Sequence, residues 1–178
     1  MKYNIDGVII VEGKSDVCYL SSFLNCLYFT TNGVDLSAEK LSFLKRAAEV
    51  NKLIIMSDDD PAGEKIRSKI KSEINGVFDI KIPKNSRKSY KKQGIAESKK
   101  EPIFAALKPF LLEKPVEWPD YELTTLISLA NDPREAKATI IRECRLLKGN
   151  NKSLENQLRI LKIDKEKVWK LIAPTSMK

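Results

Sequence analysis

Two patterns of hydrophobic positions alternate along the first half of the chain. Short, continuous apolar runs rich in β-branched residues predict buried strands, and they cover residues 4–12, 27–31, 53–56 and 77–82. Between them, apolar residues recur every three or four positions, which predicts helices, over residues 15–25, 37–50 and 61–75. Strands that alternate with helices are typical of a parallel sheet. The pattern therefore predicts an α/β fold with a parallel sheet of about four strands flanked by helices.

The last third of the chain shows helical periodicity only. Pro109, Pro115 and Pro119 interrupt regular structure before it, because proline breaks helices. Helix-start signals follow near residues 121, 133, 151 and 164. We therefore expect an α/β domain over residues 1–108, a linker over 109–120, and a small all-helical domain over 121–178.

Two of the predicted strands end in acidic residues. Glu12 follows the first apolar run, and Asp58, Asp59 and Asp60 follow the third. Sites in open α/β sheets form at the carboxyl ends of the strands, so these carboxylates should meet at one edge. Crowded carboxylates repel one another unless a cation lies between them, and hard oxygen ligands suit Mg²⁺ or Mn²⁺. The sequence thus predicts a site for metal-assisted phosphodiester chemistry.

The residues of this site also have purely structural interpretations. Asp59 or Asp60 could cap the helix that follows them. Asp16 lies in the first turn of another predicted helix, where the helix dipole favours an acidic residue. Gly13 and Gly63 permit close approach of the backbone, and Gly13 is equally typical of an ordinary turn. The sequence alone leaves these alternatives open.

Composition narrows the chemistry and the compartment. The 178 residues include no histidine, which excludes Ser-His-Asp and Cys-His catalysis and most zinc sites. Three cysteines without metal-type spacing are typical of reduced thiols. No apolar run reaches the roughly 18 residues of a membrane span, and no signal-peptide pattern is present. We therefore expect a cytoplasmic protein without membrane association.

Positive charge is concentrated in the second part of the chain. Residues 1–80 contain 10 Lys/Arg and 12 Asp/Glu, whereas residues 81–178 contain 22 and 12, which together give the net charge of +8. The segment 81–100 alone contains eight Lys/Arg and one acidic residue. An acidic site beside basic surfaces suits a nuclease, because lysine and arginine neutralise phosphates. The alternative is a basic protein whose lysines are only solvated.

Three short motifs follow one another in the first part of the chain. They are Val11-Glu12-Gly13-Lys14-Ser15-Asp16, Thr31-Asn32-Gly33 and Asp58-Asp59-Asp60-Pro61-Ala62-Gly63. Their order and spacing resemble the motifs of the Toprim domain, the metal-binding fold shared by topoisomerases, primases and several nucleases. The resemblance implies that Glu12, Asp58 and Asp60 are catalytic and bind the metal ion, with supporting roles for Gly13, Asp16, Asp59 and Gly63.

A narrower resemblance extends over nearly the whole chain. It rests on Asp58-x-Asp60-x-x-Gly63-Glu64-Lys65-Ile66-Arg67, on Lys92-Gln93-Gly94-Ile95-Ala96-Glu97, and on Leu147-Lys148-Gly149-Asn150-Asn151-Lys152-Ser153-Leu154. These stretches resemble ribonuclease M-five, a family of small enzymes that mature 5S ribosomal RNA. The resemblance implies a Mg²⁺-dependent endoribonuclease that cuts a double-stranded region of precursor 5S ribosomal RNA. It also implies that a large-subunit ribosomal protein that binds 5S RNA presents the substrate, and that Glu97 supports the site.

Basic residues in both parts of the chain are the expected RNA contacts. They are Lys14, Lys65, Arg67, Lys84, Arg87, Lys88, Lys91, Lys92, Arg142, Arg145 and Lys148. The helical domain either binds RNA or stabilises the protein by burying Trp169. Two other functions stay open, a Toprim DNA nuclease and a non-catalytic Toprim module that binds nucleic acid as a scaffold. Metal-dependent cleavage would distinguish the enzymes from the scaffold. Whether the substrate is RNA or DNA would distinguish the two enzymes.

Overall fold

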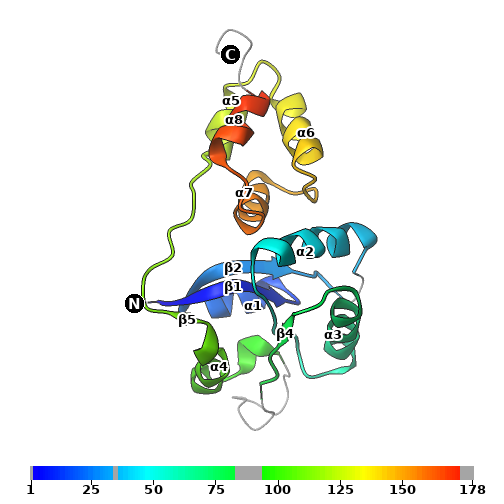
Figure 1. Cartoon of the computed structure of the whole chain (residues 1–178), viewed down its shortest axis with the longest axis vertical. Coiled ribbons are helices and arrows are strands. Elements are labelled where there is room, and N and C mark those ends of the chain that lie inside the picture. Colours follow the sequence, from blue (N-terminus) through cyan, green and yellow to red (C-terminus); the bar gives the residue numbers. More distant parts are fainter. Residues whose placement is uncertain (1, 34–35, 83–93, 173–178) are drawn as a thin grey trace. The chain divides into compact units, whose positions relative to one another are not determined.

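The chain forms two compact units. A computed structural model describes residues 2–33, 36–82 and 94–172, and its first unit is Met1–Val116 while its second is Glu117–Lys178 (Figure 1). No helix among the described residues is both long and apolar enough to cross a membrane.

The first unit is built on a sheet whose central strand is β1 (Tyr3–Val11). The strands run in the order β2 (Leu24–Thr30), β1, β3 (Leu53–Ile55) and β4 (Phe78–Asp79), and each is parallel to its neighbour. A short fifth strand, β5 (Leu111–Leu112), pairs antiparallel with the start of β1. The α/β fold and the parallel sheet of about four strands predicted from the sequence are confirmed.

Helices cover both faces of this sheet, as Figure 1 shows. On one face, Ile5 and Ile9 of β1 share a buried cluster with residues of α1 (Lys14–Ser21) and α4 (Lys100–Leu107). On the other face, Phe29 of β2 stacks on Phe43 of α2 (Ala38–Val50), and α3 (Pro61–Glu73) follows β3. Because β1 is covered on both faces, its apolar run is continuous rather than alternating.

The segment after β4 contains structure that the sequence pattern did not predict. It holds two 3₁₀ helices, η2 (Ile95–Glu97) and η3 (Lys108–Phe110), besides α4. Pro102 lies in the first turn of α4, where its missing N–H leaves no hydrogen bond unmade. Residues 109–112, expected in the linker, belong to η3 and β5, and Leu111 and Leu112 of β5 pair with the first strand.

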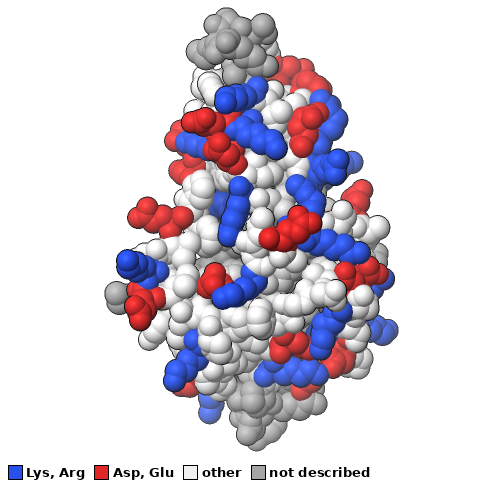
Figure 2. All heavy atoms as spheres, viewed as in Figure 1, with Lys and Arg blue, Asp and Glu red and all other residues white. Residues whose placement is uncertain are grey.

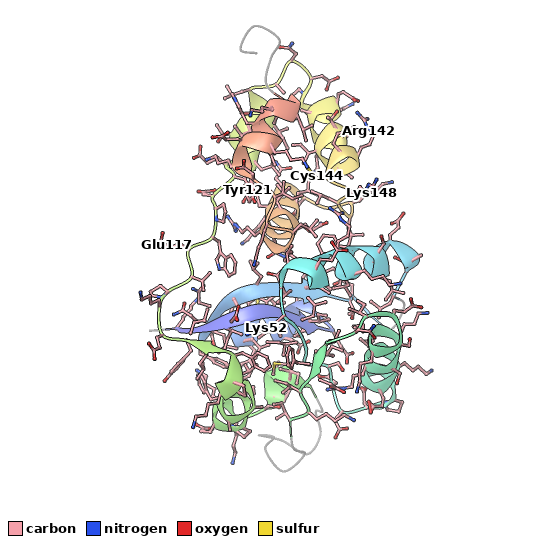
Figure 3. The ribbon with its side chains drawn as sticks, viewed as in Figure 1. Lys52, Glu117, Tyr121, Arg142, Cys144 and Lys148 are labelled. Carbon is pink, nitrogen blue, oxygen red and sulfur yellow. The ribbon has the colours of Figure 1, made fainter. Side chains whose placement is uncertain are left out.

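In its described residues, 117–172, the second unit is a group of four short helices around Tyr121. They are α5 (Leu123–Ser128), α6 (Pro133–Glu143), α7 (Asn151–Ile160) and α8 (Lys165–Ile172). Tyr121 is fully buried, its hydroxyl donates to the Ile163 carbonyl, and Cys144 is buried in the same unit (Figure 3). Trp169 is only half-buried, so Tyr121 and not Trp169 provides the aromatic centre of this core.

A buried amide fixes the turn between α6 and α7. Gln157 is 5% exposed, its Oε1 accepts from the Leu147 N–H at 2.7 Å, and its Nε2 donates to the Leu147 carbonyl at 3.0 Å. Replacing Gln157 by leucine leaves both backbone groups of Leu147 unpaired, so we expect a loss of about 2–3 kcal/mol in the stability of this unit. Loss of hydrogen-exchange protection at the Leu147 amide would report it. Lys152→Gln on the exposed side of α7 is the control, and unchanged protection in Gln157→Leu would contradict the prediction.

Candidate functional site

The two acidic loops predicted from the sequence meet at one edge of the sheet. β1 and β3 are parallel neighbours, with Ile10 opposite Ile55, so the residues that follow them emerge side by side. Glu12 Oε1 accepts a hydrogen bond from the Asp58 N–H at 2.9 Å. The structure thus brings Glu12 and Asp58 together, although they lie far apart in the sequence.

Gly63 lets α3 pack directly against these loops. A Cβ atom at this position would lie 2.0 Å from the Asp58 carbonyl oxygen and 2.9 Å from Glu12 Oε1. The Gly63 carbonyl also accepts from the Ser57 hydroxyl at 3.2 Å. No side chain can be accommodated here without moving backbone, so the glycine of the third motif is required by the close approach of helix and loop.

Asp60 caps the helix that follows it. Its Oδ1 accepts from the Gly63 N–H at 2.8 Å, and Pro61 takes the first helical position. The structural interpretation left open for Asp60 therefore describes its observed contact. This hydrogen bond uses one of the two carboxylate oxygens, and Asp59 beside it is half-buried.

A third element, η2, is attached to the acidic loops. Asp58 Oδ1 accepts from the Ile95 N–H at 2.9 Å. Asp16 is 5% exposed and accepts a hydrogen bond from the Gly13 N–H at 3.0 Å, and the nearby Ala96 backbone lowers its pKa. The Gly94-x-x-Glu97 motif predicts a supporting role for this segment, but its attachment to Asp58 is not visible in the sequence.

Burial and mutual repulsion make the carboxylates of this site weaker acids. The pKa of Asp58 is raised from its ordinary 3.8 to about 6, mainly by burial and further by the charges of Glu12, Asp16 and Asp60, against the lowering effect of its bond to Ile95. The pKa values of Glu12 and Asp16 are raised in the same direction, and burial is again the largest cause. The site therefore concentrates negative charge that a cation would stabilise.

The donor chemistry fits a hard divalent ion, whereas the present arrangement does not enclose one. In residues 2–33, 36–82 and 94–172, no three Asp, Glu or Cys side chains are arranged so as to hold a metal ion. Glu12, Asp58 and Asp60 each accept a backbone N–H through one oxygen. Binding of a metal ion by these three carboxylates would therefore require their side chains to reorient.

Arg67 has a structural role rather than the RNA contact expected from the sequence. It is 3% exposed, and its guanidinium donates to the Asp79 carboxylate, to the Ser57 carbonyl at 2.6 Å and to the Ile80 carbonyl. A buried guanidinium with all these partners cannot reach a phosphate. We therefore correct the assignment of Arg67, which ties α3 to the ends of β3 and β4.

The other expected RNA contacts are either exposed or lie outside the described residues. Lys14 and Lys65 are exposed near the starts of α1 and α3, the helices that follow the acidic loops. Arg142, Arg145 and Lys148 are exposed on the second unit, and Figure 3 shows Arg142 and Lys148 on one side of it. Lys84, Arg87, Lys88, Lys91 and Lys92 lie outside the described residues.

The visible surface carries charges of both signs. In Figure 2, Lys/Arg and Asp/Glu side chains are interspersed over the face that is shown. Arg142 illustrates this mixing, because it is 62% exposed yet pairs with Glu135 at 3.6 Å and Glu143 at 3.0 Å. A phosphate that binds Arg142 must compete with these two carboxylates.

The fold agrees with comparisons to known proteins. A Toprim domain matches residues 7–91, which include both acidic loops. The solved small Toprim domain protein from Bacillus stearothermophilus aligns with a TM-score of 0.50 and 24% identity over 61% of this chain and 90% of its own, which supports the fold.

Relatives named Ribonuclease M5 match nearly the whole chain. The protein from Bacillus subtilis is 29% identical over 90% of each chain, and that from Staphylococcus aureus is 27% identical over 86% of this chain and 89% of its own. The protein from Mycoplasma genitalium is 30% identical over 95% of this chain and 96% of its own. On these matches across both units, the chain belongs to the ribonuclease M5 family.

Proposed function

We propose that this protein is a Mg²⁺-dependent endoribonuclease that cuts precursor 5S ribosomal RNA in a double-stranded region. Its family and its Toprim domain make it a nuclease of RNA processing. The observation that carries the proposal is the group of carboxylates around Glu12 and Asp58 at the carboxyl ends of β1 and β3, whose pKa values are raised by burial and by neighbouring negative charges.

Glu12, Asp58 and Asp60 are the residues that would hold the metal ion. A bound Mg²⁺ supplies Lewis-acid polarisation of a phosphate and a more acidic water. The contribution of the chain is to keep these carboxylates at one edge. Glu12 holds the Asp58 backbone, the cap formed by Asp60 fixes the start of α3, and Gly63 keeps helix and loop in contact.

Cations on both units support an RNA substrate. Lys14 and Lys65 are exposed beside the acidic loops, and Arg145 and Lys148 are exposed on the second unit. Such residues bind phosphates without reading bases, which suits A-form RNA because its deep major groove hides the base edges. We further propose, from the family, that a large-subunit ribosomal protein that binds 5S RNA presents the substrate.

Cleavage of precursor 5S RNA by the purified chain tests this proposal. We expect discrete cuts in the presence of Mg²⁺ that are lost when a chelator is added. The reaction is run both with and without the ribosomal protein. Glu12→Gln keeps an oxygen that can accept from the Asp58 N–H but removes the charge, so it should bind RNA and cut at least 100-fold more slowly, in the range typical of lost electrostatic contacts.

A DNA duplex of the same sequence and a substrate-binding assay complete the experiment. Cleavage of the DNA but not the RNA would make the protein a DNA nuclease. Retained RNA binding with no metal-dependent cleavage would favour the scaffold function.

A further inference from the structure

The backbone next to Glu97 is fixed to helix α1. The Ser98 carbonyl accepts a hydrogen bond from the Tyr19 hydroxyl, and the buried carboxylate of Asp16 lies near the Ala96 backbone, which lowers its pKa. Asp16 and Tyr19 lie about one turn apart on the same helix. The Tyr19 hydroxyl of α1 thus fixes the backbone that carries Glu97.

The Glu97 carboxylate lies next to Asp58. A Cβ atom built on Gly94 would be 2.5 Å from Glu97 Oε2 and 3.4 Å from Asp58 Oδ2. Both carboxylates therefore face the same small space beside Gly94. The backbone of Gly94 is extended, with φ −84° and ψ 164°, which any residue can adopt. A larger residue at this position would therefore be opposed by the lack of space and not by backbone strain.

Hydrogen bonds connect η2 to the loop after β3 and to helix α1. Asp58 binds the Ile95 N–H at the start of η2, and the Asp16 carboxylate, which accepts from the Gly13 N–H beside Glu12, lies near the Ala96 backbone. Tyr19 holds the other end of η2 through Ser98, which is 2% exposed. Because the carboxylates repel one another, each needs such a contact to remain at the shared edge.

We infer that Tyr19 is a positioning residue of the nuclease centre, because its hydroxyl, through Ser98, sets the carboxylate of Glu97 beside Asp58. The inference rests on the proposed function and adds a residue to its site. The Tyr19 ring has a separate role, since it packs edge-on against Phe23 at 5.4 Å between ring centroids. Tyr19→Phe therefore removes the hydroxyl contact and keeps the packing.

A double-mutant cycle between Tyr19→Phe and Glu97→Gln tests the inference. Loss of a contact that orients a ligating or catalytic group typically costs about tenfold or more. We expect Tyr19→Phe to lower kcat on precursor 5S RNA by about tenfold with KM within twofold, and to weaken Mn²⁺ binding measured by calorimetry by a similar factor. In the Glu97→Gln background, Tyr19→Phe should cause no further loss, because the group that it positions is already gone.

Two other variants make the result specific. Tyr28→Phe removes another hydroxyl of the same unit, one buried beside Cys26 on β2, and should leave kcat and Mn²⁺ affinity unchanged. Gly94→Ala should reproduce the Tyr19→Phe effect, because the added methyl group displaces the Glu97 carboxylate.

The outcomes separate this inference from the proposed function. The positioning role is overturned if Tyr19→Phe has the wild-type kcat, or if Tyr19→Phe causes the same loss with and without Glu97→Gln. In either case the proposed nuclease function is unaffected. If the wild type does not cut but the Mn²⁺ affinities show the coupling, the proposed function fails and the positioning of Glu97 remains.

Discussion

Replacing Asp58 by asparagine is expected to abolish metal-dependent cleavage and to stabilise the metal-free protein at neutral pH. The asparagine Oδ1 can still accept from the Ile95 N–H, so the attachment of η2 is kept. The charge is lost, and with it the repulsion from Glu12, Asp16 and Asp60 that helps to raise the Asp58 pKa. We expect at least a 100-fold loss of activity, as for other lost electrostatic contacts in active sites.

The stability effect depends on pH in a direction that the pKa fixes. Because the folded-state pKa of Asp58 is about 6 and its ordinary value is 3.8, folding favours the protonated form. The stabilisation linked to protonation is complete below the ordinary value and is lost as the pH rises through about 6. Relative to wild type, Asp58→Asn should therefore gain stability between about pH 4 and pH 7, reaching about 1–2 kcal/mol after solvent screening.

Thermal unfolding of the metal-free proteins from pH 4 to 7.5 measures this difference. Asp6→Asn is the control, because Asp6 is about half exposed and pairs with Lys52 away from the site. The prediction fails if Asp58→Asn loses stability relative to wild type as the pH rises. Saturating Mg²⁺ should reduce the advantage of the variant, since an ion bound to the wild-type carboxylates stabilises the folded state.

Replacing Arg67 by methionine is expected to cost about 3–5 kcal/mol of stability, the range for breaking a buried ion pair from one side. The change leaves the Ser57 and Ile80 carbonyls without the guanidinium, and within the described part of the chain it leaves Asp79 with Lys71 at 3.2 Å as its remaining cation. Arg67 joins the end of β3 to the end of β4, so its loss should also loosen the loop that carries Asp58.

Lys65→Met on the same helix is the matched control for Arg67. Lys65 is exposed, and exposed substitutions usually change stability by less than about 0.5 kcal/mol. Urea unfolding of the first unit, followed by circular dichroism, distinguishes the two variants. Equal midpoints for Arg67→Met and Lys65→Met would show that the buried guanidinium contributes little.

The sequence predicted those parts of the fold that depend on local periodicity. The continuous apolar run of β1 and the apolar spacing of α2 and α3 identified their elements, because burial on a sheet or on one helix face imposes that spacing. α4 and β5 were missed. Pro102 disguises the start of the helix, and β5 is a two-residue strand that exists only through pairing with Asn4 and Ile5, about a hundred residues earlier in the chain.

The same distinction applies to the site. Glu12 and Asp58 could be paired from the sequence because strand ends in a parallel sheet meet at one edge. The burial of Arg67 could not be predicted, because its partners Asp79 and Ile80 reach it only after β4 has joined the sheet. Tyr19 carried no sequence signal, since its hydroxyl contacts a carbonyl 79 residues away.

The pairing of β5 with β1 also affects how the first unit folds during its synthesis. β1 leaves the ribosome before its two partners along one edge, β3 and, nearer its start, β5, which follows about a hundred residues later. Contacts this distant in sequence raise the contact order and slow folding. During translation, β1 therefore lacks its pairing with β5 until residue 112 has emerged. In this interval the exposed apolar strand is a binding site for chaperones.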